Sequence, residues 1–265
     1  MGGDRITQWS MSRLQVFELC PYRVKLQYVD KVPDTQEHKS ADRGSKIHEE
    51  CEKYVRGEIE LTPNMKHFYP EFKALRIEYD AGNVTCEEEW GFDNEWNEAP
   101  WSEAWLRMKC DCVIHLNKQE LLIVDYKTGQ RYGNEVKHQQ QLQLYAVAGL
   151  LRFPEIENVI CELWYLDKNE LARFVLPRSE MDKHLRYFTD KGDQMCAETE
   201  FAPNPTLHSC RFCPYQPNKQ GNCKFGLAIE RGQIVEKIEV NVPEGYVADP
   251  AAAEAAAAFL ASFKF

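Results

Sequence analysis

The sequence predicts an α/β fold in which a mixed central sheet is flanked by helices. Apolar residues at helical spacing dominate residues 10–79, three extended runs follow between residues 84 and 127, and helices then alternate with strands. This order is typical of a sheet covered by helices. With 265 residues and 43% hydrophobic content, the chain can bury one sizeable core. We therefore expect one main domain over residues 1–230 and a C-terminal extension over residues 231–265, docked or partly flexible.

The N-terminal third of the chain predicts helices. Ser10 and Ser12 are possible N-caps for a helical segment over residues 10–29, which Pro21 would break or restart. Two further helices are expected over residues 41–55 and 64–79, where apolar residues recur at helical spacing.

The rest of the chain predicts strands and two more helices. Short apolar runs, bounded by turn residues, indicate strands, and longer periodic segments indicate helices. The expected strands are 84–92, 105–116, 120–127, 159–166 and 171–176, and the expected helices are 134–151 and 179–195. Beyond them we expect an extended segment over residues 234–242. An alanine-rich helix over residues 251–260 is marginal alone, so it either docks or stays mobile.

The net charge of −10 argues against a protein that coats nucleic acid without specificity, because neutralising phosphates needs clustered lysine and arginine. It does not exclude a nuclease, since bound cations would return positive charge where a phosphate sits. No apolar stretch approaches the roughly 20 residues that span a bilayer, and the first residues lack the apolar core of a secretion signal. We expect a protein of the bacterial cytoplasm, or a phage protein in the host cytoplasm, with no membrane partner.

Polar residues at the end of the predicted strand 120–127 indicate a site. Asp125 and Lys127 are two residues apart, so they project from the same face of that strand, and Asp111 lies on the preceding strand. Together with His48 they offer oxygen ligands for Mg²⁺ and an imidazole that widens the choice to Mn²⁺. Such a site activates water for phosphodiester hydrolysis, with the ammonium stabilising developing charge. The plainer interpretation is a surface ion pair at the end of a hairpin.

Glutamates on the predicted strand 84–92 are secondary candidates. Because the acids at positions 87 to 89 are contiguous, a period of two cannot say which of them points inward. Glu87 or Glu89 could join a metal site or bind a metal-bound water, and we keep Glu89 as the candidate. The alternative is a solvated strand face.

Read in order, these motifs resemble those of RecB-family exonucleases in the PD-(D/E)XK nuclease superfamily, over roughly residues 10–225. The matching features are His48 four residues after Gly44, Asp111, Asp125-Tyr126-Lys127, and Gln141 four residues before Tyr145. The resemblance implies a restriction-endonuclease-like sheet and DNA as substrate, single-stranded or at duplex ends. It also implies that His48, Asp111, Asp125 and the Tyr126 carbonyl bind Mg²⁺ or Mn²⁺. Lys127 would then position or activate the attacking water, and Gln141 and Tyr145 would be catalytic residues that face the active site and the DNA strand. The alternative for Gln141 and Tyr145 is ordinary amphipathic packing.

The late cysteines form a second group. Cys210 and Cys213, followed by Cys223, have metal-ligand spacing, and three thiolates need a fourth ligand to complete a zinc site or an iron-sulfur cluster. The segment around Cys20 resembles the N-terminal cysteine segment of RecB-like nucleases, including CRISPR adaptation nucleases and AddB-type subunits. That resemblance implies a [4Fe-4S] cluster joining the two ends of the domain.

Two other residues could supply the fourth ligand. With His208 or Cys196 as the fourth ligand, a local Zn²⁺ knuckle is reasonable. The remaining cysteines lie on apolar segments and are expected to be buried free thiols: Cys51, Cys86, Cys110, Cys112 and Cys161.

The sequence thus predicts a metal-dependent DNA exonuclease, acting in phage-type recombination or replication or in DNA processing, with possible partner proteins from those pathways. One alternative is a nuclease of CRISPR spacer acquisition. The other is a noncatalytic DNA-binding or scaffold protein of the same fold.

Overall fold

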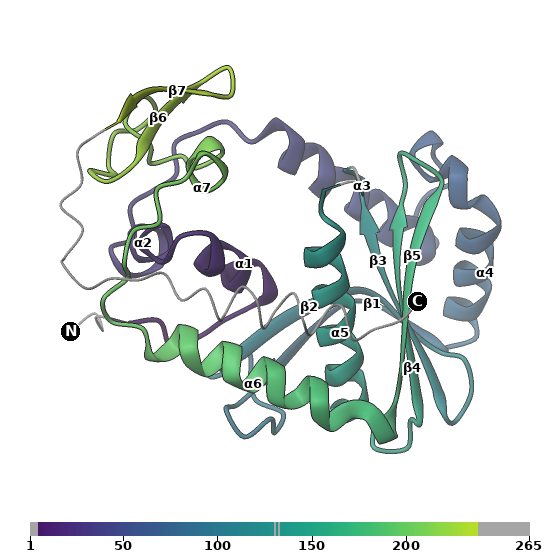
Figure 1. The fold of residues 1–265 in the computed structure, drawn as a ribbon. Coiled ribbons are helices and arrows are strands. Elements are labelled where there is room, and N and C mark those ends of the chain that lie inside the picture. Colours follow the sequence, from purple (N-terminus) through teal and green to yellow (C-terminus); the bar gives the residue numbers. More distant parts are fainter. Residues whose placement is uncertain (1–4, 130, 132, 238–265) are drawn as a thin grey trace. The chain divides into compact units, whose positions relative to one another are not determined.

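The computed structural model describes residues 5–237 except residues 130 and 132. Contacts divide the chain into a first unit, Met1–Asn204, and a second unit, Pro205–Phe265. The first unit contains the sheet and most of the helices (Figure 1). Over the described residues, none of the helices combines the length and apolar character that crossing a membrane requires.

The first unit is built on a five-stranded mixed sheet with strand order β1-β2-β3-β4-β5. Its strands are β1 (Val84–Phe92), β2 (Leu106–His115), β3 (Glu120–Lys127), β4 (Asn158–Tyr165) and β5 (Glu170–Pro177). The pairs β1–β2, β2–β3 and β4–β5 are antiparallel, whereas β3 and β4 are parallel. A parallel pair needs a crossover, which the helix α5 (Glu135–Arg152) provides. The predicted mixed sheet flanked by helices is confirmed, with strand bounds within one residue of those expected.

The N-terminal helices follow the local capping signals. Helix α1 (Met11–Leu19) begins after Ser10, whose side chain accepts a hydrogen bond from the Arg13 amide. Cys20 is extended, and Pro21 opens α2 (Pro21–Val24), which continues into a π-helical turn over Lys25–Val29. Helix α3 (Lys39–Val55) starts two residues earlier than expected. The predicted segment 64–79 is a 3-10 turn, Pro63–Phe68, followed by α4 (Tyr69–Asp80).

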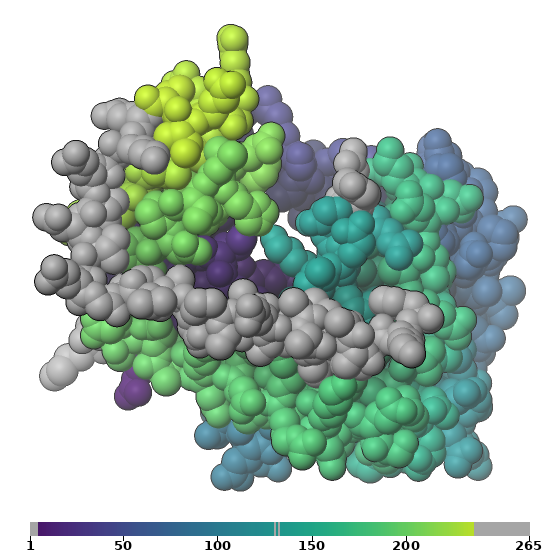
Figure 2. Space-filling model, in the orientation of Figure 1, coloured from purple at the N-terminus to yellow at the C-terminus, as the bar shows by residue number. Residues whose placement is uncertain are grey.

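Two apolar clusters cover opposite faces of the sheet. One joins strand residues to α1, α5 and α6 (Met181–Ala197), through side chains such as Phe17, Leu142 and Phe188. The other joins strand residues to α3 and α4, through Cys51 and Phe72. In Figure 1, α4 and α5 accordingly lie on either side of the sheet. Helix α6 buries one face and lies at the surface with the other, as the green atoms of Figure 2 show.

The second unit is small. Helix α7 (Leu207–Arg211) begins with a capping box between Thr206 and Ser209. Strands β6 (Leu227–Glu230) and β7 (Gln233–Lys237) form an antiparallel pair, so the expected extended segment begins one residue early. The expected alanine-rich helix over residues 251–260 lies outside the described residues.

Gly192 on α6 makes a testable prediction about packing. A Cβ at this position would overlap the Trp105 ring and lie 2.6 Å from Trp9 Nε1, and these two indoles pack edge to face. Rigid rings cannot yield cheaply, so we expect Gly192→Ala to lower the free energy of unfolding by about 1–2 kcal/mol, overpacking outweighing the gain in helix propensity. Urea unfolding followed by circular dichroism measures the difference.

Gly129→Ala is the matched control, because a Cβ there meets nothing within 4 Å. Its stability should stay within about 0.5 kcal/mol of the parent. Equal stability of the two variants would contradict tight packing at Gly192.

Candidate metal centre

Three acidic residues form a row across neighbouring strands. On β1 and β2, Cys86 pairs with Cys112 and Glu88 pairs with Cys110, so Glu87 lies opposite Asp111. On β2 and β3, Cys112 pairs with Val124, and the same register places Asp111 opposite Asp125. Residues directly opposite on antiparallel strands have their Cβ atoms about 4.5–5.5 Å apart. The register alone therefore concentrates negative charge at one level of the sheet.

At the level of this row, the alternate side chains of β1 and β2 switch from one face of the sheet to the other. Val84 belongs to the apolar cluster under α3 and α4, whereas Trp90, also at an even position of β1, belongs to the cluster under α5. Cys110 and Cys112 of β2 are divided in the same way. Between them Glu87 has a φ of 59°, in the left-handed region that few residues other than glycine adopt. The regular alternation of side chains is broken at the row itself.

Asp111 is held from two sides. Its Oδ1 lies 3.1 Å from His48 Nδ1, and its Oδ2 accepts a 2.6 Å hydrogen bond from the backbone amide of Tyr126. The Asp111 side chain is buried, with the residue 8% exposed. His48 reaches it from α3, where Ile47 and Cys51 anchor the helix in the apolar cluster. The imidazole also packs edge to face on the Tyr126 ring, with centroids 5.7 Å apart.

Asp125 receives its partners from α5 and from its own strand. Its Oδ1 accepts hydrogen bonds from Gln141 Nε2 at 3.0 Å and from the Tyr145 hydroxyl at 2.9 Å. The Tyr145 hydroxyl also lies 3.0 Å from the Lys109 carbonyl, so its single proton serves one acceptor at a time. Asp125 Oδ2 forms an ion pair with the Lys127 ammonium and has no hydrogen-bond partner among the described residues. Asp125 is 4% exposed.

Glu87 extends the site toward solvent. Within the described part of the chain, one group of three or more His, Cys, Asp and Glu residues has its ligand atoms within 4.8 Å of one another, namely His48, Glu87 and Asp111. These residues line a pocket of about 510 Å³ together with Lys109, which forms an ion pair with Glu87. The sequence could not assign Glu87 to the site, because its neighbours are also glutamates and the left-handed backbone at Glu87 breaks the period of two. Glu89, the candidate kept from the sequence, is exposed and is not in the group.

The protonation of His48 and Asp111 depends on their shared burial. Burial lowers the pKa of His48, but the hydrogen bond to Asp111 and the charges of Asp111 and Asp125 outweigh it, so its pKa is raised. Burial raises the pKa of Asp111, and the charge of Asp125 adds to this effect, so its pKa lies above the usual value despite His48 and the Tyr126 amide. A bound cation would favour the deprotonated forms of both groups.

The donor set fits a hard divalent cation. Asp111 and Glu87 offer carboxylate oxygens, as Mg²⁺ prefers, and the imidazole of His48 suits Mn²⁺ as well. Asp125, which the sequence also predicts as a ligand, is not in this group, and its Oδ2 pairs with the Lys127 ammonium. The structure thus gathers the sequence-predicted residues His48, Asp111, Asp125, Lys127, Gln141 and Tyr145. Tyr126 contributes its amide to Asp111 and its ring to the core, while its carbonyl as a metal ligand stays a prediction.

A histidine that the sequence did not single out lies beside this site. His138 is three residues before Gln141 on α5, and its Nδ1 lies 2.6 Å from the Tyr165 hydroxyl. Tyr165 is the β4 partner of Lys127 in the parallel register. Burial, with the charge of Lys127 adding to it, lowers the pKa of His138 to about 4, so this imidazole is neutral at neutral pH. The helical spacing from Gln141 is the signal that could have identified it.

The predicted cysteine ligands lie in different units. Cys20 is in the first unit, where its Sγ accepts a 3.5 Å contact from the Asn204 amide. Cys210 and Cys213 are buried in the second unit, and Cys223 is half-buried there. Among the residues that the structure describes, these three do not form a group with ligand atoms within 4.8 Å. The other five predicted thiols are free, and Cys86 is half-buried rather than buried.

The site combines acidic residues on adjacent strands of a mixed sheet, an Asp-x-Lys pair and a histidine from a flanking helix. This combination suits the binding of a divalent cation next to a phosphodiester. The family model described as the PD-(D/E)XK nuclease superfamily matches residues 8–218. The chain belongs to this superfamily.

Solved structures similar to this chain share little sequence with it. The protein SSO0001 is 15% identical, with a TM-score of 0.42, over 79% of this chain and 84% of its own. An exonuclease candidate from Eubacterium rectale is 9% identical, with a TM-score of 0.48, over 91% and 94%. The alkaline exonuclease LHK-Exo from Laribacter hongkongensis is 14% identical, with a TM-score of 0.26, over 73% and 91%. No curated protein matches the chain, so the superfamily assignment rests on the model matched over residues 8–218.

Glu87 gives the sharpest test of the metal centre. We expect Glu87→Gln to weaken Mn²⁺ binding at least about tenfold, because an amide oxygen replaces a charged ligand. Titration calorimetry with Mn²⁺ measures this affinity. Glu89→Gln, on the same strand but exposed, is the control and should bind Mn²⁺ like the parent. Equal affinity in the Glu87 and Glu89 variants would remove Glu87 from the site.

Proposed function

We propose that this chain is a Mg²⁺- or Mn²⁺-dependent DNA exonuclease. The observation that carries the proposal is the row of Glu87, Asp111 and Asp125 with Lys127 and His48 around it, in a member of the PD-(D/E)XK nuclease superfamily. Buried carboxylates side by side are costly unless cations or donors surround them. Their arrangement suits binding of a divalent cation together with a phosphodiester.

The proposed roles follow from the contacts of each residue. His48, Asp111, Asp125 and the Tyr126 carbonyl would hold the cation, with Glu87 as a further ligand. A bound divalent cation lowers the pKa of an attacking water and stabilises charge on phosphoryl oxygens. The Lys127 ammonium, beside Asp125 Oδ2, would orient the water and stabilise negative charge that develops on the phosphate.

Gln141 and Tyr145 would act through Asp125 rather than on the substrate. Both donate to Asp125 Oδ1, so they fix the rotation of this carboxylate and direct Oδ2 toward Lys127. Partners of this kind around metal ligands usually influence metal affinity and activity strongly.

Exonuclease action and the pathway are inferred from the resemblance to RecB-family exonucleases. The proposed substrate is DNA, single-stranded or at duplex ends, processed in phage-type recombination or replication alongside protein partners of those pathways. Spacer acquisition in a CRISPR system is the alternative pathway. The proposed location is the bacterial cytoplasm, or the host cytoplasm for a phage protein.

Hydrolysis of labelled DNA tests the proposal. With Mg²⁺ or Mn²⁺, we expect Asp125→Ala and Lys127→Ala to lower the rate at least about 100-fold, because each removes a group that acts in the transition state. Lys118→Ala removes the same charge from the exposed loop between β2 and β3, and should cleave like the parent. End-labelled linear DNA should yield short products, whereas covalently closed circles should remain intact.

Three results would point elsewhere. Equal rates in all variants would defeat the enzymatic role of this site. Tight DNA binding by anisotropy, with no cleavage by the parent, would favour the noncatalytic scaffold alternative. Cutting of closed circles would replace exonuclease action by endonuclease action.

We also propose, from the cysteine spacing and the resemblance, that Cys20, Cys210, Cys213 and Cys223 hold a [4Fe-4S] cluster. The proposed nuclease domain then covers residues 1–230, with residues 231–265 as an extension. Such a cluster would close a loop of about 190 residues and reduce the entropy of the unfolded chain, as a cross-link does. A Zn²⁺ site completed by His208 or Cys196 is the competing assignment.

Anaerobic purification tests the cluster. The parent protein should be brown with broad visible absorption, and Cys20→Ser should lose the colour together with bound iron and sulfide. Cys196→Ser should keep both. A colourless protein with one equivalent of zinc, lost in the Cys196 or a His208 variant, would establish the zinc alternative.

A further inference from the structure

Arg43 connects three segments around the candidate metal centre. Its Nη1 donates to Asp167 Oδ2 at 2.9 Å and its Nη2 donates to Asp167 Oδ1 at 2.7 Å, which is a two-pronged pair. Nη1 also lies 3.3 Å from the carbonyl of Thr128. Arg43 is on α3, Thr128 directly follows β3, and Asp167 is in the turn after β4. We call this set of contacts the Arg43 clamp.

The clamp lies between residues of the metal centre. Five residues after Arg43, α3 carries His48, whose Nδ1 is 3.1 Å from Asp111. Thr128 directly follows Lys127, the partner of Asp125. The Leu166 amide donates to the Lys127 carbonyl at 2.9 Å, so the turn that carries Asp167 is itself attached to the end of β3. A movement of α3 along the ends of the strands would both displace His48 and break the contacts of the Arg43 clamp.

Gly44 indicates how closely α3 approaches β3 at this point. A Cβ on Gly44 would lie 3.2 Å from Thr128 Oγ1, closer than ordinary van der Waals contact. Helix α3 therefore packs closely against Thr128, the residue that follows β3. A planar guanidinium that binds both Thr128 and Asp167 fixes the direction of this contact.

We propose that Arg43 is a positioning residue, which holds His48 of α3 at the distance from β3 that metal binding needs. This proposal rests on the proposed function of the site. Arg43 is half exposed, with its side chain 50% accessible, so the ion pair itself contributes little to stability. The effect of Arg43 is instead to fix the position of α3 relative to β3.

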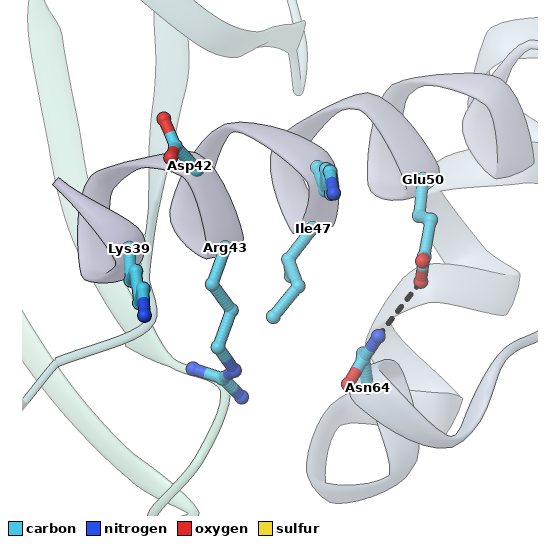
Figure 3. Close-up of a pocket in the computed structure, with 7 residues that line it drawn as sticks. Lys39, Asp42, Arg43, Ile47, Glu50 and Asn64 are labelled. Atoms are coloured by element: carbon cyan, nitrogen blue, oxygen red, sulfur yellow. Dashed lines mark hydrogen bonds between the residues drawn. The ribbon is translucent and has the colours of Figure 1, made fainter. Parts of the chain in front are cut away.

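The competing role is a contact to a DNA phosphate. Arg43 lines a pocket of about 420 Å³ together with Lys39 and Lys46. Figure 3 shows the Arg43 side chain extended from α3 on the same side as Lys39 and Ile47. A phosphate contact depends on the charge of residue 43 alone, whereas the clamp depends on Asp167 and on the fork of the guanidinium. The two roles can therefore be separated by substitution.

Four variants test the proposal: Arg43→Lys, Arg43→Gln, Asp167→Asn and the double variant Arg43→Gln with Asp167→Asn. We expect each to weaken Mn²⁺ binding about tenfold in calorimetry and to lower kcat by a similar factor, with KM for DNA little changed. The double variant should bind Mn²⁺ no more weakly than Arg43→Gln or Asp167→Asn alone, because all three variants break the same interaction. Lys39→Gln, which removes a charge from the same pocket, should leave Mn²⁺ affinity and kcat unchanged.

The outcomes are distinct. Full activity and Mn²⁺ affinity in Arg43→Lys and Asp167→Asn, with a raised KM in Arg43→Gln, would overturn the clamp in favour of a phosphate contact. A loss of Mn²⁺ affinity accompanied by a large fall in thermal stability would show a general structural role instead and would also overturn it. If the parent protein cleaves no DNA, the proposed function fails, and Mn²⁺ affinity still decides whether Arg43 positions His48.

Discussion

Mutual repulsion of carboxylates on adjacent strands is the constraint on which this structure depends. Glu87, Asp111 and Asp125 occupy one row of the sheet, and the two aspartates are buried. Two like charges about 5 Å apart repel by about 3 kcal/mol at an effective dielectric constant of about 20. That is a large share of the roughly 5–15 kcal/mol by which a domain is stable. Each element around the row therefore brings a donor or a cation: His48 from α3, Gln141 and Tyr145 from α5, and Lys127 from β3.

The sheet accommodates this row at a place where its regular geometry fails. A continuous alternation would direct each second residue of β1 and β2 into one apolar cluster, yet both strands change cluster at the level of Glu87 and Asp111. The left-handed backbone of Glu87 costs about 1–3 kcal/mol in residues of this type. As a result, Glu87 and Asp111 lie outside both apolar clusters and face the pocket that His48 and Lys109 also line. The backbone strain at Glu87 and the position of the candidate site therefore both follow from this break in the alternation of side chains.

These features explain what the sequence could predict. The order and bounds of the strands followed from apolar periodicity, and the Asp125–Lys127 pair followed from the strand period, because β3 is regular up to Lys127. Glu87 was not separable from its neighbours, because φ at a single residue decides which glutamate points inward and periodicity carries no information on it. The pairing of Asp111 with Asp125 depends on strand register, which is a long-range property. The contacts of Gln141 depend on how α5 docks on the sheet, which periodicity alone does not give. The resemblance to RecB-family exonucleases indicated which face of this helix is directed to the active site.

The two buried aspartates divide their oxygens between the fold and the site. Asp111 commits Oδ2 to the Tyr126 amide, and Asp125 commits Oδ1 to Gln141 and Tyr145, so these bonds fix each carboxylate plane. The other oxygen of each faces a titratable or cationic side chain, His48 for Asp111 and Lys127 for Asp125. Because Asp125 Oδ1 already accepts two hydrogen bonds, its Oδ2 is the oxygen better placed to accept a further donor or a cation. Because the inward bonds come from a strand amide and from α5, the docking of that helix determines which oxygen is left for chemistry. Helix α5 thus fixes the orientation of the Asp125 carboxylate at the candidate metal centre.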